Sequence, residues 1–112
     1  MSVVTVYAIF ADLAEAQAIG RAMVEQRLAA CVNILQPCRS IYRWEGAIET
    51  ASEVPALFKT TLDQADGLIA AIAERHSYAV PAAVVWPIAK LPDAYAAWVE
   101  ASVGAADDRP LA

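Results

Sequence analysis

The sequence predicts one α+β domain, with strands and helices in the order β-α-β-β-α-β and an added C-terminal helix. Two observations support this order. Stretches rich in β-branched and aromatic residues alternate with stretches whose apolar residues recur every three or four positions, and capping residues precede the latter. This is the order of the ferredoxin-like sandwich, in which two helices cover one face of an antiparallel sheet. We expect the domain to span residues 1–103, with a short polar tail at 104–112.

The first strand and helix have the clearest local signals. Val3–Phe10 is rich in β-branched and aromatic residues, which favours a central strand. Asp12 then provides a helix N-cap, and Glu15 three residues later completes a capping box. Small and apolar residues at helical spacing predict the buried face of this helix: Ala16, Ile19, Gly20, Met23 and Val24.

The middle of the chain reads as extended structure. A second strand is expected at Ala29–Leu35, and after a bend at Pro37 it continues over Arg39–Glu45. Gly46 marks a turn, and the third strand is expected from about Ser52 to Thr60. The second and third strands are therefore predicted to be unusually long.

The second half repeats the helix–strand alternation. A second capping box at Thr61–Gln64 opens a helix that we expect to end at His76. Ala82–Ile88 is expected to form the last central strand. The added helix begins near Pro92, which suits a first helical turn, and ends at Gly104.

The composition contains more apolar residues than one small domain needs. Of 112 residues, 59% are hydrophobic, and although 26 are alanine, 40 larger apolar side chains remain. The longest uncharged stretch near the C-terminal half, residues 77–89, is too short for a bilayer span and contains two prolines. In the predicted sandwich only one sheet face is covered by helices of the same chain. We therefore expect another subunit to cover the second face.

Charge and cysteine content narrow the partners and the compartment. The net charge is −5 and no basic stripe is present, so nucleic-acid binding is not expected. No secretory signal is recognisable, and Cys31 and Cys38 are expected to be reduced thiols. These features predict a cytoplasmic protein that binds neither membrane nor nucleic acid.

Six motifs, in order from about Val4 to Val103, resemble those of the CutA family of divalent-cation tolerance proteins: Leu28–Ile34, Ser40–Gly46, Ser52–Val54, Lys59–Thr60, His76–Pro81 and Tyr95–Trp98. The resemblance implies a ferredoxin-like subunit and a tight homotrimer built by sheet-to-sheet contacts of the long hairpin. It also implies a cytoplasmic location, a role in metal tolerance and copper binding.

Two residues are candidate metal ligands. His76 is the only imidazole, and Cys31 is a potential soft ligand for copper. Their alternatives are structural: a residue at the C-terminus of a helix for His76 and a small buried residue for Cys31. The family usually reads His-Pro-Tyr-Glu-Val-Pro, whereas His76–Pro81 here reads His-Ser-Tyr-Ala-Val-Pro, so a carboxylate is missing. We therefore expect copper or another divalent cation to bind only weakly, with ligands at a subunit boundary.

Polar residues of the long strands form a second candidate site. Arg43 and Glu45 are two residues apart, as expected for one strand face, and pairing across Gly46 could bring them near Glu53 and Lys59. These charges either form interface salt bridges that fix the strand register or, together with Tyr78, line an inter-subunit cleft that binds a small anion. Three aromatic residues are expected to pack in interfaces: Tyr42, Trp44 and Trp98.

No enzyme template fits the sequence. There is neither a Gly-x-Ser-x-Gly turn nor a Gly-rich phosphate loop, so we do not expect catalysis. The first hypothesis is a homotrimeric metal-tolerance protein with weak copper binding. One alternative is a trimeric small-molecule sensor like the PII signalling proteins, although the direct turn at Gly46 leaves no room for their long loop. The other is a stable trimeric scaffold without a ligand.

Overall fold

The structure is a computed structural model that describes residues 2–104. The predicted order of elements is confirmed, with the second predicted strand divided at Pro37 into two strands. The predicted tail falls almost wholly outside the described residues. The elements are β1 (Val3–Phe10), α1 (Leu13–Glu25), β2 (Cys31–Ile34), β3 (Cys38–Trp44), β4 (Ala47–Thr61), α2 (Leu62–Arg75), β5 (Ala83–Pro87) and α3 (Asp93–Ser102).

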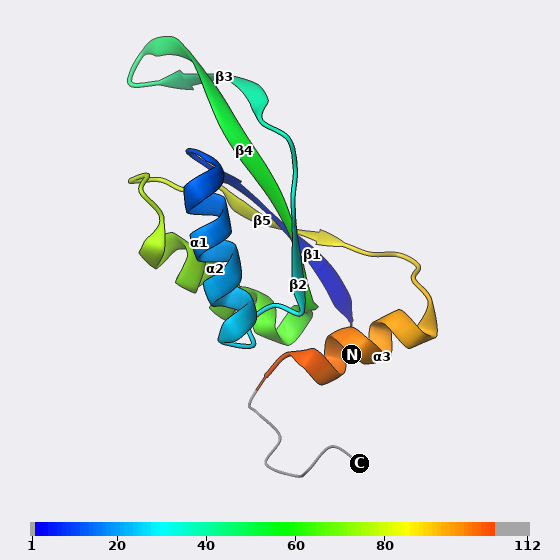
Figure 1. Cartoon of the computed structure of the whole chain (residues 1–112). Helices are drawn as coiled ribbons and strands as arrows, with labels where there is room; N and C mark the ends of the chain where they lie inside the picture. Colours follow the sequence, from blue (N-terminus) through cyan, green and yellow to red (C-terminus); the bar gives the residue numbers. More distant parts are fainter. Residues whose placement is uncertain (1, 105–112) are drawn as a thin grey trace.

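The sheet is antiparallel and is organised around β4. Its strand order is β2-β4-β1-β5, and β3 pairs with the N-terminal part of β4. Because β4 is 15 residues long, its C-terminal half can pair with β1 and β2 while its N-terminal half pairs with β3. Figure 1 shows the resulting β3–β4 ribbon extending away from the helices.

One sheet face carries the main core. Alternate residues of β1 and β4 point towards α1 and α2, and Phe10 meets Phe58 edge to face, with ring centroids 6.4 Å apart. Met23, Leu68 and Ile72 are also among the largest fully buried side chains of this layer. The two helices thus cover this face, as the ferredoxin-like prediction requires.

The opposite face, which we call the open face, is not bare along its whole length. Val3 lies on it, and Val99 of α3 is buried against Val3 and Ala30. Arg27 holds α3 in place, since its Nε donates to the carbonyl oxygen of Gly104 at 2.9 Å. The expectation that the chain covers only one sheet face is therefore wrong at the Val3 end, where the added helix packs.

The two predicted capping boxes have different outcomes. Asp12 caps α1 by accepting a hydrogen bond from the Glu15 amide at 2.8 Å, as predicted. The Glu15 carboxylate, however, accepts from the amide of Ala11 rather than from Asp12. Thr61 is the N-cap of α2, but its side chain makes no capping bond, and its Oγ1 is buried without a partner. The second capping box is therefore wrong, because this hydroxyl is enclosed by the fold instead of facing the helix amides.

Two neighbouring threonines give a matched test of this difference. Thr60 Oγ1 donates to the carbonyl oxygen of Leu28 at 2.7 Å, so Thr60→Val should lower the free energy of unfolding by about 1–2 kcal/mol. Thr61→Val removes an unpaired hydroxyl and should leave stability unchanged or raise it. Guanidinium unfolding at one protein concentration measures both changes. An equal loss in both variants would contradict the assignment.

Candidate functional site

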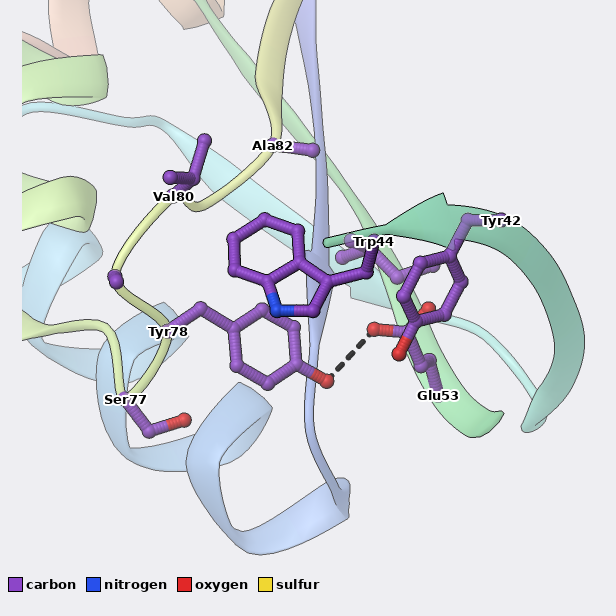
Figure 2. Close-up of a pocket in the computed structure, with 9 residues that line it drawn as sticks. Tyr42, Trp44, Glu53, Ser77, Tyr78, Val80 and Ala82 are labelled. Atoms are coloured by element: carbon purple, nitrogen blue, oxygen red, sulfur yellow. Dashed lines mark hydrogen bonds between the residues drawn. The ribbon is translucent and has the colours of Figure 1, made fainter. Parts of the chain in front are cut away.

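A pocket of about 540 Å³ opens where the β3–β4 ribbon leaves the sheet. Its walls come from the ribbon, the end of β1 and the loop that follows α2. Figure 2 shows the labelled side chains gathered around it. The lining residues are Ile9, Tyr42, Trp44, Glu53, Ser77, Tyr78, Ala79, Val80 and Ala82.

Strand register places the ribbon side chains on one face. Cys38 pairs with Glu53 and Trp44 pairs with Ala47, so Tyr42, Trp44 and Glu53 project to the same side of the ribbon. Ile9 pairs with Pro55, two residues beyond Glu53, and continues this face onto the sheet. The pocket therefore lies on the open face, at the end opposite α3.

Glu53 and Tyr78 form the polar contact of the pocket. The Tyr78 hydroxyl donates to Glu53 Oε2 at 2.7 Å, and Glu53 is only 6% exposed. Burial and this hydrogen bond raise the pKa of Tyr78 far above its ordinary value, so the phenol keeps its proton. Within residues 2–104 no Lys, Arg or His lies within ion-pair distance of Glu53. Among the described residues, the carboxylate therefore has a neutral hydrogen-bond donor and no counter-cation.

His76 lies directly behind the pocket and is enclosed. Its Nε2 donates to the Ile9 carbonyl oxygen at 2.7 Å, and its Nδ1 accepts from the Tyr78 amide at 3.1 Å. The ring stacks on Phe10 with centroids 5.2 Å apart, and the side chain is 0% exposed. Because one ring nitrogen carries its proton and the other already accepts a hydrogen bond, neither offers a lone pair to a metal ion.

Glu15 fixes the loop that carries Tyr78. Its Oε1 accepts from the Ala11 amide at 3.1 Å and its Oε2 from the Ser77 amide at 3.0 Å. Burial opposes ionisation, but hydrogen bonds from Ser77 and Ala11 outweigh it and lower the pKa of Glu15. The carboxylate thus joins the start of α1 to the loop after α2.

Cys31 is remote from this arrangement. Its Sγ lies 3.7 Å from the Tyr95 hydroxyl, and burial together with this contact raises the pKa of Tyr95 to about 12. Cys31 pairs with Lys59 and Lys59 with Thr5, whereas His76 binds Ile9, four residues further along β1. Four steps are about 13 Å, so Cys31 and His76 of one chain cannot share an ion.

The other predicted site residues do not converge with Glu53 within one chain. Arg43 pairs with Ile48, and Glu45 lies in the turn with a φ of 49°. Lys59 donates to Asn33 Oδ1 at 3.4 Å, six residues along β4 from Glu53. The expectation that pairing across Gly46 brings these charges together is wrong, because β4 starts at Ala47 and the register places other residues opposite one another. An inter-subunit cleft stays a prediction.

Four of the residues that line the pocket were already candidates in the sequence, but Glu15, which holds the pocket loop in place, was not. Tyr42, Trp44, Glu53 and Tyr78 all line the pocket, although Tyr42 and Trp44 were assigned to interface packing. Trp98 lies in α3, where its ring is 5.8 Å from that of Tyr95. Glu15 was recognised only as part of a cap, and no sequence pattern indicated its bond to the Ser77 amide.

The donor set of one chain does not fit a copper site. Within the described residues, no group of three or more His, Cys, Asp or Glu side chains is arranged to hold a metal ion. The imidazole of His76 is already saturated by the Ile9 and Tyr78 main chain. Metal ligands would have to come from exposed residues or from more than one subunit.

The fold and the open face define a ferredoxin-like α+β protein with a β ribbon and an added helix. Residues 4–102 match the family model described as CutA1 divalent ion tolerance protein. The chain belongs to the CutA family of divalent-cation tolerance proteins, as its motifs predicted.

Three relatives show how closely the chain follows this family. The CutA divalent-cation tolerance protein of Pectobacterium atrosepticum is 37% identical over 92 residues, 82% of this chain and 84% of that protein. The divalent cation tolerance protein from Thermus thermophilus has a TM-score of 0.88 at 36% identity, covering 91% of this chain and 99% of that one. The periplasmic divalent cation tolerance protein CutA from Archaeoglobus fulgidus has a TM-score of 0.88 at 31% identity, with the same two coverages.

Among residues 2–104, no helix has the length and apolar character needed to span a bilayer.

Proposed function

We propose that this chain acts in divalent-cation tolerance as a cytoplasmic homotrimer that binds copper or another divalent cation only weakly and catalyses no reaction. Membership of the CutA family supports the role in tolerance. The observation that carries the weak-binding part is the state of His76, whose two ring nitrogens are both used by the main chain.

The half-buried thiol of Cys31 is the better candidate for a copper contact. It lies at the start of β2, near Tyr95, and thiolate sulfur is a preferred ligand of copper. A single thiol with no imidazole beside it gives an incomplete site. Binding through it should therefore be weak unless a second subunit adds ligands.

Exposed apolar side chains support assembly of several chains. Val84 and Trp86 on the open face are 46% and 47% exposed, and Ile41 and Ile48 of the ribbon are 69% and 60% exposed. A monomer in water would leave these groups uncovered. A homotrimer built over the open face and the ribbon buries them and agrees with the apolar surplus of the sequence.

Calorimetric titration with copper(II), and with redox-inert zinc(II) in parallel, tests the metal part of this proposal. The full chain should bind with a Kd no tighter than about 10 µM. Cys31→Ser should weaken that binding, whereas His76→Asn should not change it. Saturable binding of one tight ion per chain that His76→Asn abolishes would contradict the proposal.

The Archaeoglobus fulgidus relative is described as periplasmic, so the compartment of this chain needs a test of its own. Fractionation of cells that express the full chain distinguishes the cytoplasm from the periplasm. Recovery of the protein mainly in the periplasmic fraction would contradict a cytoplasmic site of action.

A second candidate function is a small-molecule sensor, and the 540 Å³ pocket is the observation that favours it. The anionic metabolite expected for a PII-like sensor does not suit this pocket, because none of its nine lining residues is Lys or Arg. A scaffold without any ligand remains the third hypothesis, and it predicts that His76→Asn and Lys59→Ala variants keep full metal tolerance in cells.

A further inference from the structure

We infer that α3 is a strap that opens and closes over the Val3 end of the sheet as one unit, with the Arg27 side chain as its latch, and that its opening controls access to the Cys31 thiol. The metal part of this inference rests on the proposed copper contact of Cys31, whereas the motion of the strap does not. Every contact that carries the inference lies within one chain, so none depends on which neighbours cover the open face.

The strap is held to the sheet by a small apolar cluster. α3 is 10 residues long, and Val99 is its one buried side chain. The cluster beneath it contains three buried residues, Val3, Ala30 and Val99, whereas the main core contains fourteen. No side chain caps the start of the helix at Pro92. Because a helix this short is marginal without tertiary contacts, α3 should open at a lower free energy than the rest of the fold.

The end of the strap is fixed from the chain that follows α1. The Arg27 guanidinium donates from Nε to the Gly104 carbonyl oxygen at 2.9 Å and from Nη2 to the Ala101 carbonyl oxygen at 3.0 Å. The Gly104 amide donates back to the Arg27 carbonyl oxygen at 2.9 Å. The last turn of α3 has no basic residue of its own. Arg27 therefore supplies both hydrogen bonds for the final carbonyl groups and a cation that complements the helix dipole.

The backbone of Arg27 is strained. Its φ of 61° lies in the left-handed region, and it follows the C-cap of α1, Gln26, at a position where Gly is the usual residue. A residue with a Cβ is disfavoured in this conformation. Gly would avoid the strain but could not reach α3, which indicates that the Arg27 side chain has the role of holding the helix.

Tyr95 connects the strap to Cys31. It lies in the first turn of α3, and its hydroxyl is 3.7 Å from the Cys31 Sγ. Cys31 is half-buried at the start of β2. Opening of α3 removes the phenol from the thiol and admits a soft metal ion or a thiol reagent. The strength of the latch thus determines the fraction of time in which Cys31 can react.

Hydrogen exchange of the full-length protein, followed by mass spectrometry without added metal, tests the motion. Residues 97–102 of α3 should exchange at least about tenfold faster than the central residues of β1. Arg27→Gly suits the left-handed backbone and removes the latch, so it should accelerate exchange in α3 about 10- to 100-fold and leave β1 unchanged. Arg21→Ala removes an exposed arginine that pairs with Glu25 within α1, and it should change neither rate.

Gly104→Ala loosens the strap from its other side and keeps the test decisive if Arg27→Gly folds poorly. The added Cβ has room, since the nearest side-chain atom, Gln64 Nε2, would be 3.6 Å away. The φ of 86° is nevertheless unfavourable for alanine. The bond from this amide to the Arg27 carbonyl oxygen should therefore weaken, and α3 should exchange faster.

Thiol labelling links the motion to Cys31. In a Cys38→Ser background Cys31 is the one remaining thiol. Removal of the latch by Arg27→Gly should accelerate its reaction with Ellman's reagent by the same factor as the exchange of α3. Copper titration of the same two proteins separates this inference from the proposed function, because copper should bind more tightly without the latch. Faster exchange and labelling without any copper binding would support the strap and count against the copper proposal.

Three results would overturn the motion. One is exchange of α3 at the rate of β1 in the wild type. Another is unchanged exchange and labelling in both Arg27→Gly and Gly104→Ala, with folding of each variant checked by circular dichroism. The third is exchange of α3 that slows as the protein concentration rises, because dissociation of subunits would then expose the helix. Measurable copper affinity that is equal with and without the latch would overturn the control of metal access.

Discussion

Replacing His76 by alanine is expected to lower the free energy of unfolding by about 2–4 kcal/mol. The substitution removes the ring that stacks on Phe10 and leaves a cavity in a fully buried position. It also removes the partners of the Ile9 carbonyl and the Tyr78 amide. Each of these main-chain groups then needs water in a region that the fold encloses, and that requirement adds to the loss of packing.

His76→Asn separates the two hydrogen bonds. An Asn side chain can accept from the amide two residues later, as an Asx turn does, so the bond to the Tyr78 amide can persist. The shorter side chain cannot reach Ile9. We therefore expect an intermediate loss of stability for Asn, measured by guanidinium unfolding at a fixed protein concentration.

The result would also distinguish a structural His76 from a metal-binding one. In the structural role, both variants lose stability in the absence of any added metal, and copper does not restore the difference. A wild-type protein whose unfolding midpoint rises with copper, beside His76 variants of unchanged metal-free stability, would contradict this role.

The sequence predicts the elements well where the signal is local. Val3–Phe10 and the Asp12 cap are found as expected, because a β-rich run and an N-cap depend on neighbouring residues. The start of β4 was placed at Ser52 instead of Ala47, since the polar residues between them do not alternate with apolar ones. Their pairing with β3 is determined by the two-residue turn at Glu45 and Gly46, both with positive φ.

The candidate site depends on contacts that no local pattern contains. The bond between Glu53 and Tyr78 joins residues 25 apart, and that between Glu15 and Ser77 joins residues 62 apart. His76 was a reasonable metal candidate by residue type, but only its surroundings show that both nitrogens are used. Residue type therefore predicted which side chains matter, whereas packing determines what each can bind.

A single negative charge on the open face is expected to break the proposed trimer. Val84 lies on β5 opposite Tyr7 and is 46% exposed, close to the stack of Tyr7 on Trp86, whose ring centroids are 4.8 Å apart. In a homotrimer built over this face, Val84→Glu would place three carboxylates in apolar contacts. A buried, unpaired carboxylate costs several kcal/mol, and symmetry repeats that cost at each interface.

The mass in solution is the direct measurement. Light scattering should give about 36 kDa for the wild type, three times the 11.9-kDa chain, and about 12 kDa or aggregated material for Val84→Glu. Ala18→Glu is the matched control, because it adds the same charge on the exposed side of α1 and should leave the trimer intact. A Val84→Glu protein that remains trimeric at micromolar concentration would contradict assembly through the open face, since the charge would then lie in water. The ribbon residues Ile41 and Ile48, which are 69% and 60% exposed, would in that case be the first alternative surface to test for assembly.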